Sequence, residues 1–83
     1  MLTKQILIRD VSYNPEGLDI NAINYYIQLF GTNPETIDFI EVMFIAEPKG
    51  KQHKYEILDG RHRLCALRSL GNVIVTAKIV GED

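Results

Sequence analysis

The chain has 83 residues, a length at which we expect one domain spanning residues 1–83 with a modest hydrophobic core. Hydrophobic residues make up 46% and charged residues 24%, as in ordinary globular proteins. The net charge of −2 argues against a dedicated DNA-binding module, so we expect weak or no direct DNA binding. Without a membrane-length apolar run or a secretory signal, and with Cys65 as the single cysteine, we expect a cytoplasmic protein with no membrane contact.

Alternating apolar residues predict a first strand over residues 4–11. An Asn-Pro loop at 12–17 then leads to a helix with Asp19 as its N-cap and Gly31 as its stop. We expect the core face of this helix to be the apolar stripe of Ile20, Ile23, Ile27 and Phe30. After a turn, a strand over 37–46 is apolar on both alternating faces, which predicts either cover on both sides or a central position in the sheet.

The second half of the chain continues with a polar loop at 47–54 and a strand at 55–58. A helix closed by Gly71 is predicted over about 60–70, and its expected inward side chains are Leu64, Leu67 and Leu70. A final strand over 73–80 precedes a loose tail at 81–83. The order β-α-β-β-α-β predicts a small α+β domain with helices packed against a mixed sheet.

The second helix begins with an unusual charge. Arg61, His62 and Arg63 occupy its first turn, directly after an Asp-Gly turn. The N-terminal end of a helix carries roughly +0.5 of an elementary charge, so cations are disfavoured there, and its first amides lack acceptors. A bound anion resolves both problems, and phosphate is the usual one. The sequence therefore predicts a phosphate-binding helix N-terminus.

The distribution of charge supports a local anion site in this half of the chain. Residues 1–48 hold two basic and seven acidic residues, whereas residues 49–83 hold seven basic and four acidic ones. The two parts therefore carry net charges of −5 and +3, and the positive part contains the predicted phosphate turn.

Four consecutive residues are the candidates for phosphate binding. Arginine guanidinium groups match phosphate oxygens geometrically, a glycine lets the backbone approach closely, and a histidine can donate to an oxygen. The predicted phosphate site is Gly60, Arg61, His62 and Arg63. The alternatives are a plain turn glycine, a histidine that caps or packs locally and a solvated pair of arginines.

Two carboxylates complete the candidate site. Glu16, in the Asn-Pro loop, and Asp59 are the candidates for a magnesium ligand. The candidates for general acid–base catalysis are Glu16, Asp59 and His62. The alternatives are an exposed loop position for Glu16 and a helix N-cap for Asp59. Cys65 is expected to be a buried structural thiol, and Arg68 to extend the basic patch or to be solvated.

The element order and the residues 59–66, Asp-Gly-Arg-His-Arg-Leu-Cys-Ala, resemble the ParB/sulfiredoxin superfamily over nearly the whole chain. In ParB-type partition proteins the corresponding motif, Gly-Glu-Arg-Arg-x-x-Ala, binds nucleotide phosphates. Residues 60–63 and Ala66 occupy that pattern here. The resemblance thus implies a ParB/sulfiredoxin fold and a ParB-like motif.

Other branches of the superfamily match less well. The sulfiredoxin motif is Gly-Cys-His-Arg, but Arg61 replaces the catalytic cysteine and Cys65 lies one helical turn onward, so sulfiredoxin chemistry is not expected. The free-serine kinase motif is Asp-Gly-His-His-Arg, and its matching residues are Asp59, Gly60, His62 and Arg63.

Three functions remain open from the sequence. The first is a ParB-like nucleoside triphosphate-binding switch or DNA-associated regulator that takes Mg²⁺ with CTP or ATP. The second is a small phosphotransferase, NTPase or nuclease of the same fold, so enzymatic activity stays undecided. The third is a ligand-free regulator of a mobile element or phage that binds protein or DNA. A protein partner or a homodimer is compatible with each.

Overall fold

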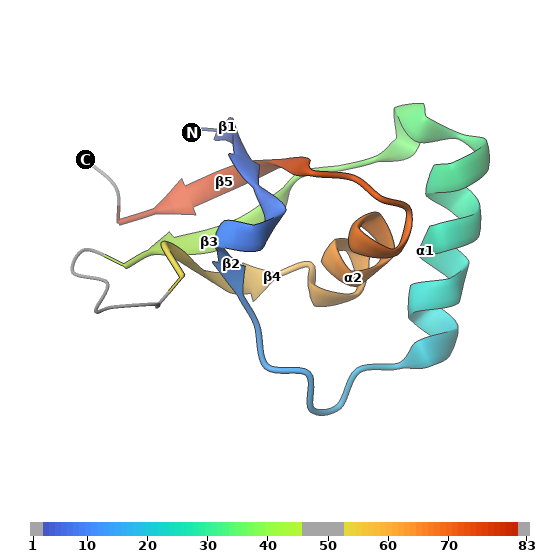
Figure 1. The fold of residues 1–83 in the computed structure, drawn as a ribbon, viewed down its shortest axis with the longest axis horizontal. Coiled ribbons are helices and arrows are strands. Elements are labelled where there is room, and N and C mark those ends of the chain that lie inside the picture. The colour runs from blue at the N-terminus through green and yellow to red at the C-terminus, as the bar shows by residue number, and fades with distance from the viewer. Residues whose placement is uncertain (1–2, 46–52, 82–83) are drawn as a thin grey trace.

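The computed structural model describes residues 3–45 and 53–81, and in this part of the chain five strands form one mixed sheet (Figure 1). In chain order these strands are β1 (Thr3–Leu7), β2 (Val11–Ser12), β3 (Ile40–Phe44), β4 (Tyr55–Asp59) and β5 (Ile74–Val80). They lie in the order β1-β5-β3-β4-β2. The pairs β1–β5 and β3–β4 are antiparallel, and the pairs β5–β3 and β4–β2 are parallel. The predicted α+β class with a mixed sheet is confirmed.

The predicted strand over residues 4–11 is wrong in one respect, because a 3₁₀ turn, η1 (Ile8–Asp10), divides it into β1 and β2. These two short strands form opposite edges of the sheet although only three residues separate them. The sheet must therefore curl until its edges approach one another. Ile8, the first residue of the turn, and Val11, the residue after the turn, are both buried, and the Ile8 amide donates to the Val73 carbonyl at 2.9 Å.

Helix α1 (Ile20–Thr32) begins as predicted, since the Asp19 side chain accepts a hydrogen bond from the Asn21 amide at 2.9 Å. The helix continues through the expected stop at Gly31 and ends at Thr32. The expected core position of Ile20 is also wrong, because this side chain is 69% exposed. Helix α1 packs against the second helix, and a short 3₁₀ turn, η2 (Pro34–Thr36), follows it.

Strand β3 begins at Ile40, three residues later than predicted. Ile40 and Val42 are fully buried, whereas Met43 is 40% exposed, so the predicted cover on both sides is wrong. The alternative of a central strand is confirmed, because β3 lies between β5 and β4. The end of the predicted strand at Ala46 lies outside the described residues, as do parts of the predicted loop at 47–54 and of the tail.

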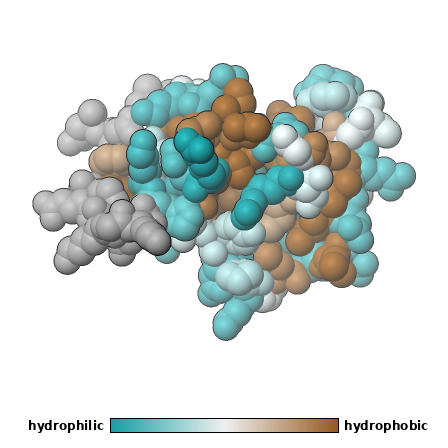
Figure 2. Space-filling model, viewed as in Figure 1, coloured by the Kyte–Doolittle hydropathy of each residue, from teal (hydrophilic) through white to brown (hydrophobic). Residues whose placement is uncertain are grey.

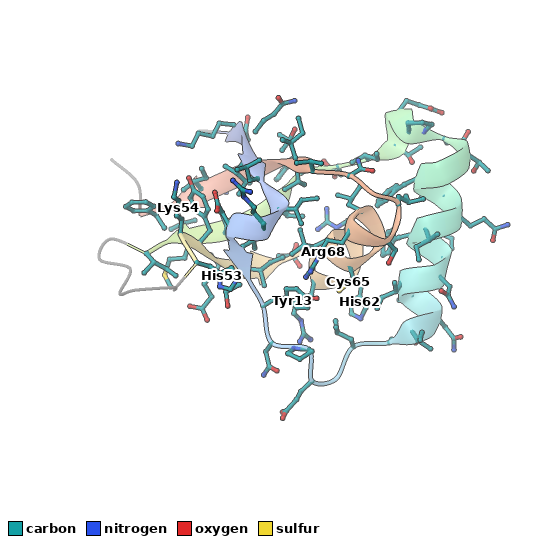
Figure 3. All side chains as sticks on the ribbon, viewed as in Figure 1. Tyr13, His53, Lys54, His62, Cys65 and Arg68 are labelled. Atoms are coloured by element: carbon teal, nitrogen blue, oxygen red, sulfur yellow. The ribbon has the colours of Figure 1, made fainter. Side chains whose placement is uncertain are left out.

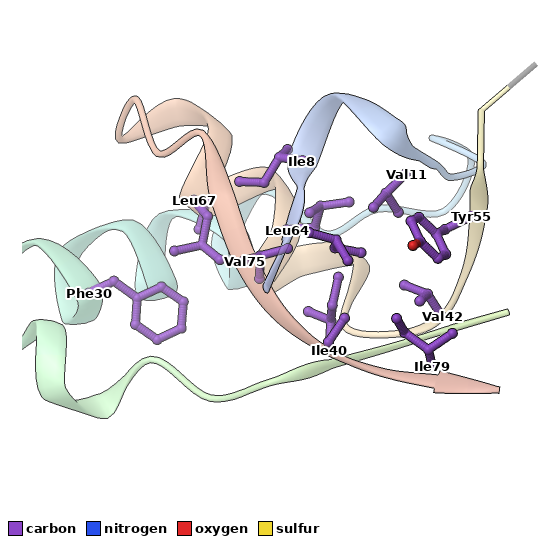
Figure 4. Close-up of a cluster of buried hydrophobic side chains, with 13 residues drawn as sticks. Ile8, Val11, Phe30, Ile40, Val42, Tyr55, Leu64, Leu67, Val75 and Ile79 are labelled. Atoms are coloured by element: carbon purple, nitrogen blue, oxygen red, sulfur yellow. The ribbon is translucent and has the colours of Figure 1, made fainter. Parts of the chain in front are cut away.

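Helix α2 (Arg61–Ser69) lies between the sheet and α1 (Figure 1). Leu64 and Leu67 enter the core as predicted, whereas Leu70 is 38% exposed and does not. The core contains side chains from the sheet and both helices (Figure 4). It consists of Ile6, Ile8, Val11, Phe30, Ile40, Val42, Tyr55, Leu64, Ala66, Leu67, Val75, Ala77 and Ile79. No described helix has the length and apolar character needed to cross a membrane.

Candidate functional site

The turn between β4 and α2 requires glycine for a reason that involves no ligand. Gly60 has φ +107° and ψ +25°, a left-handed conformation that L side chains rarely adopt. A Cβ atom at this position would lie 2.8 Å from Cγ2 of Ile40, in the fully buried part of β3. Gly60 therefore sets the direction of α2 through both its conformation and its close contact with the sheet.

The N-terminus of α2 has no side-chain cap. Gly60 is the N-cap residue, and Asp59 is the last residue of β4, so the alternative of Asp59 as N-cap is wrong. The first amides of a helix have no acceptor within the helix, and here no side chain supplies one. The helix dipole and the absence of an acidic residue in the first turn leave this end electropositive.

Arg61 and His62 hold the segment that connects the sheet to α1. We define residues 13–19 as the strap. Nη1 of Arg61 donates to the Asn14 carbonyl at 2.7 Å and to the Glu16 carbonyl at 2.9 Å. Nε2 of His62 accepts from the Asp19 amide at 3.0 Å, so this nitrogen serves as an acceptor here. Two first-turn side chains therefore fix the strap across about 45 residues of sequence.

Arg63 is directed to the sheet. Its Nη1 donates to the Phe39 carbonyl at 2.7 Å, and its Nη2 lies 3.3 Å from Oδ2 of Asp59. The Arg63 side chain is 19% exposed, whereas that of Asp59 is 74% exposed. The alternative of a solvated arginine pair is therefore wrong for Arg61 and for Arg63, because both bind carbonyl groups of the chain.

A hollow of about 370 Å³ opens at this helix start. Its lining combines the cationic turn with an aromatic and an aliphatic side chain, and consists of Tyr26, Leu58, Asp59, Gly60, Arg61, His62 and Arg63. Of the residues predicted for the site, only Glu16 does not line the hollow. Its side chain is exposed, and its backbone carbonyl contacts Arg61 instead.

Tyr26 and Leu58 are the lining residues that sequence reasoning missed. Tyr26 projects from α1, where its ring stacks on that of Phe30 with centroids 5.4 Å apart. Leu58 is 51% exposed although it lies in the apolar run of β4. The two adjacent tyrosines of α1 were a sequence signal for an aromatic residue at a site. No local pattern, however, predicts that α1 lies across the start of α2.

Carboxylates are sparse around the hollow. Asp59 is the acidic side chain in its lining, and its position beside Arg63 partly balances the charge of that guanidinium. Within residues 3–45 and 53–81, no three His, Cys, Asp or Glu side chains gather in a way that could hold a metal ion. An ion here would thus need most of its oxygen ligands from a phosphate group or from water.

The C-terminal half of α2 contacts the beginning of the strap (Figure 3). Nη1 of Arg68 donates to the Tyr13 hydroxyl at 3.1 Å, and its guanidinium lies 5.8 Å from the Tyr13 ring centroid. A hydrogen bond to the Cys65 thiol, together with burial, raises the pKa of Tyr13, and nearby Arg68 opposes this change. Cys65 is half-buried, whereas the sequence predicted a buried thiol.

Comparison with solved structures identifies the fold. Arabidopsis thaliana sulfiredoxin superposes with a TM-score of 0.76 at 15% identity, covering 99% of this chain and 88% of that one. Caulobacter crescentus ParB, complexed with CTP-gamma-S, superposes with a TM-score of 0.70 at 15% identity, covering all of this chain and 46% of that one. A conserved hypothetical protein from Pyrococcus furiosus gives 0.74 at 20% identity, covering 96% of this chain and 32% of that one.

The chain therefore has the ParB/sulfiredoxin fold. It spans less than half the length of the ParB and Pyrococcus chains that it resembles. No protein-family model and no curated protein matches the sequence.

Proposed function

We propose that this chain binds a nucleoside triphosphate, with the phosphates at the start of α2, and acts as a ParB-like switch. The observation that supports this most is the composition of the hollow. Uncapped helix amides and two arginines line one part of it, and the Tyr26 ring and Leu58 line another. A ligand that joins an anionic group to an aromatic ring suits both parts, and a nucleotide has this chemistry.

The phosphate oxygens would accept from the amides of the first turn of α2 and from Arg61. That guanidinium uses Nη1 for both strap carbonyls, and among the described residues its Nε and Nη2 atoms bind no other group. Arg63 would contribute mainly its charge, because its side chain is only 19% exposed and its two Nη atoms already bind the Phe39 carbonyl and Asp59. Gly60 sets the direction of the helix that presents these amides.

Magnesium would accompany the triphosphate, CTP or ATP, with Asp59 as the nearest carboxylate. The structure of ParB with CTP-gamma-S, which has the same fold, supports a nucleotide as the ligand. Glu16 would join a metal site only if the strap moved, since its side chain lies outside the lining of the hollow.

Shared use of Arg61 favours a switch. A triphosphate bound to Nε and Nη2 of this guanidinium would share the side chain with the Asn14 and Glu16 carbonyls on Nη1, so binding would be coupled to the position of the strap. Turnover would need a positioned nucleophile, and His62 presents Nε2 as an acceptor to Asp19 instead of to the hollow.

One observation favours another of the three candidates, a ligand-free regulator that binds protein or DNA. Arg61 and Arg63 both have partners within the chain, so a structural role alone accounts for their presence. ParB has been solved in complex with the centromeric parS site, and a DNA-associated role is the corresponding proposal here.

Calorimetric titration with CTP, ATP and GTP in the presence of Mg²⁺ tests the proposed function. Arg61→Gln removes the charge at the hollow, and Arg68→Gln removes the same charge at the other end of the helix. We expect one triphosphate to bind the wild type, at least about tenfold weaker binding by Arg61→Gln, and a change of less than about twofold in Arg68→Gln. Failure of all three nucleotides to bind at millimolar concentration would overturn the proposal and favour the ligand-free regulator.

A further inference from the structure

A second hollow, of about 250 Å³, lies near the C-terminal end of α2. Its walls come from the η1 turn and from the connection between α2 and β5, and its lining is Ile8, Arg9, Arg68, Asn72 and Val73. Two backbone hydrogen bonds fix these walls, from the Ile8 amide to Val73 at 2.9 Å and from the Asn72 amide to Leu67 at 3.0 Å. The hollow is separate from the proposed nucleotide site and shares no lining residue with it.

The charge of this hollow is uncompensated. Arg9 and Arg68 both line it, and no acidic side chain does. Among the described residues, the Arg9 guanidinium has no hydrogen-bond or ion-pair partner, and the adjacent carboxylate of Asp10 lies 4.0 Å from Lys54 instead. Two guanidinium groups that share a hollow repel each other, so an anion placed between them is stabilised by both.

Arg68 is already positioned for such an anion. The Tyr13 hydroxyl accepts from its Nη1 and the Tyr13 ring lies beneath its guanidinium, so little side-chain freedom is left to lose on binding. Its other nitrogens have no partner within the described residues. A forked oxyanion such as a carboxylate matches the planar guanidinium group.

The surroundings of the two arginines are apolar. Val73 is 66% exposed and Ile74, the next residue, is 47% exposed. Figure 2 shows apolar surface in the middle of the face on which Arg68 lies (Figure 3), bordered by strongly hydrophilic side chains. Exposed apolar side chains around buried or fixed arginines are typical of protein–protein contacts, whereas a phosphodiester backbone selects basic and polar surfaces.

We propose that the hollow lined by Arg9 and Arg68 is a docking site for a protein partner that presents a carboxylate side chain beside apolar side chains. The carboxylate binds between the two guanidinium groups, and the neighbouring apolar side chains cover Val73 and Ile74. The positive charge of the site is complementary to such a segment, and the proposal does not depend on nucleotide binding.

The test is an NMR titration of the ¹⁵N-labelled 83-residue chain with two peptides, acetyl-Ala-Leu-Glu-Leu-Ala-amide and the same peptide with glutamine in place of glutamate. We expect the glutamate peptide to shift the resonances of Arg9, Arg68, Asn72 and Val73, and the glutamine peptide to bind at least about tenfold more weakly. Equal binding of the two peptides, or shifts confined to other surfaces, would overturn the proposal.

Single-residue variants test whether the glutamate peptide binds at this hollow. The Arg9 side chain has no partner in the described structure, so Arg9→Gln should keep the fold. It should weaken binding of the glutamate peptide by about tenfold. Lys78→Gln removes one positive charge from an ion pair with Glu41 on the sheet, and should change the affinity by less than about twofold. Equal weakening by both variants would indicate nonspecific charge attraction and contradict a site. Tighter binding of inorganic phosphate or of oligo(dT) than of the peptide would contradict a protein partner.

Discussion

The two ends of helix α2 carry arginines in opposite situations. At the N-terminal end, Arg61 and Arg63 bind carbonyl groups of the strap and of the segment before β3. At the C-terminal end, Arg68 contacts Tyr13 and lines a hollow together with Arg9, which has no partner among the described residues. The dipole of the helix disfavours cations at its first end and favours them at its second. A cation at the unfavourable end of a helix therefore indicates a residue with a specific interaction, and that interaction can be purely structural.

The largest predicted effect is the difference in stability between alanine variants of the glycines at the two ends of α2. Gly60→Ala should lower the free energy of unfolding by roughly 3–5 kcal/mol, because a left-handed alanine is strained and its Cβ meets Ile40. Gly71→Ala is the matched control, since φ is +84° there and no atom lies within 4 Å of the added Cβ. Its cost should be about 1–2 kcal/mol. Urea denaturation of both variants measures the difference, and equal losses of the free energy of unfolding would contradict a steric role of Ile40.

Loss of Arg61 should open the strap. Arg61→Gln removes a donor that serves two carbonyls, which should raise the rate of cleavage after exposed Glu16 by a glutamate-specific protease roughly 5- to 30-fold. Arg68→Gln, which loses one bond to Tyr13, should have a smaller effect. Equal cleavage rates in the wild type and Arg61→Gln would show that other contacts hold the strap.

Removal of the His62 side chain should change the hydrogen exchange of a single amide, that of Asp19. In His62→Ala we expect hydrogen exchange of the Asp19 amide to accelerate about fivefold, because one exposed hydrogen bond is lost. His62→Gln offers a carbonyl oxygen near the same place and should restore part of the protection. Unchanged exchange in His62→Ala would contradict the contact, and NMR exchange rates decide between the outcomes.

The smallest predicted effect concerns Tyr13 at high pH. Its pKa is raised in the fold, so the folded state disfavours the ionised phenol and binds the proton more tightly than the unfolded state. This contribution to stability is complete below about pH 10 and is lost as the pH rises through the folded pKa. Thermal unfolding between pH 9 and pH 11 should therefore show a steeper decline for the wild type than for Tyr13→Phe. Parallel declines would contradict the raised pKa.

Local sequence signals predicted the elements around α2 well. Asp19 caps α1 because its carboxylate reaches the Asn21 amide two residues away. Gly71 ends α2 in a Schellman motif, in which the amides of Gly71 and Asn72 bind the carbonyls of Arg68 and Leu67. Both arrangements depend on residues within a few positions of one another, and propensities and spacing describe such interactions directly.

Features that depend on distant partners were not predicted. The alternation over residues 4–11 continues through Ile8, yet the chain turns there because β1 pairs with β5 and β2 with β4 at the other edge of the sheet. In the same way, Tyr26 reaches the hollow only because α1 lies across the start of α2. No local pattern records which strand or helix will be the neighbour.

The sequence by itself determined the α+β class, the strand–turn–helix around Gly60 and the cluster of cations at the helix start, because these follow from spacing, turn chemistry and charge. Only the tertiary structure decided what those cations contact. Arg61 reaches carbonyls 45 and 47 residues away, and Arg63 one that is 24 residues away. Backbone carbonyls are present in every residue and leave no mark in a sequence, so folding alone selects which of them an arginine will bind.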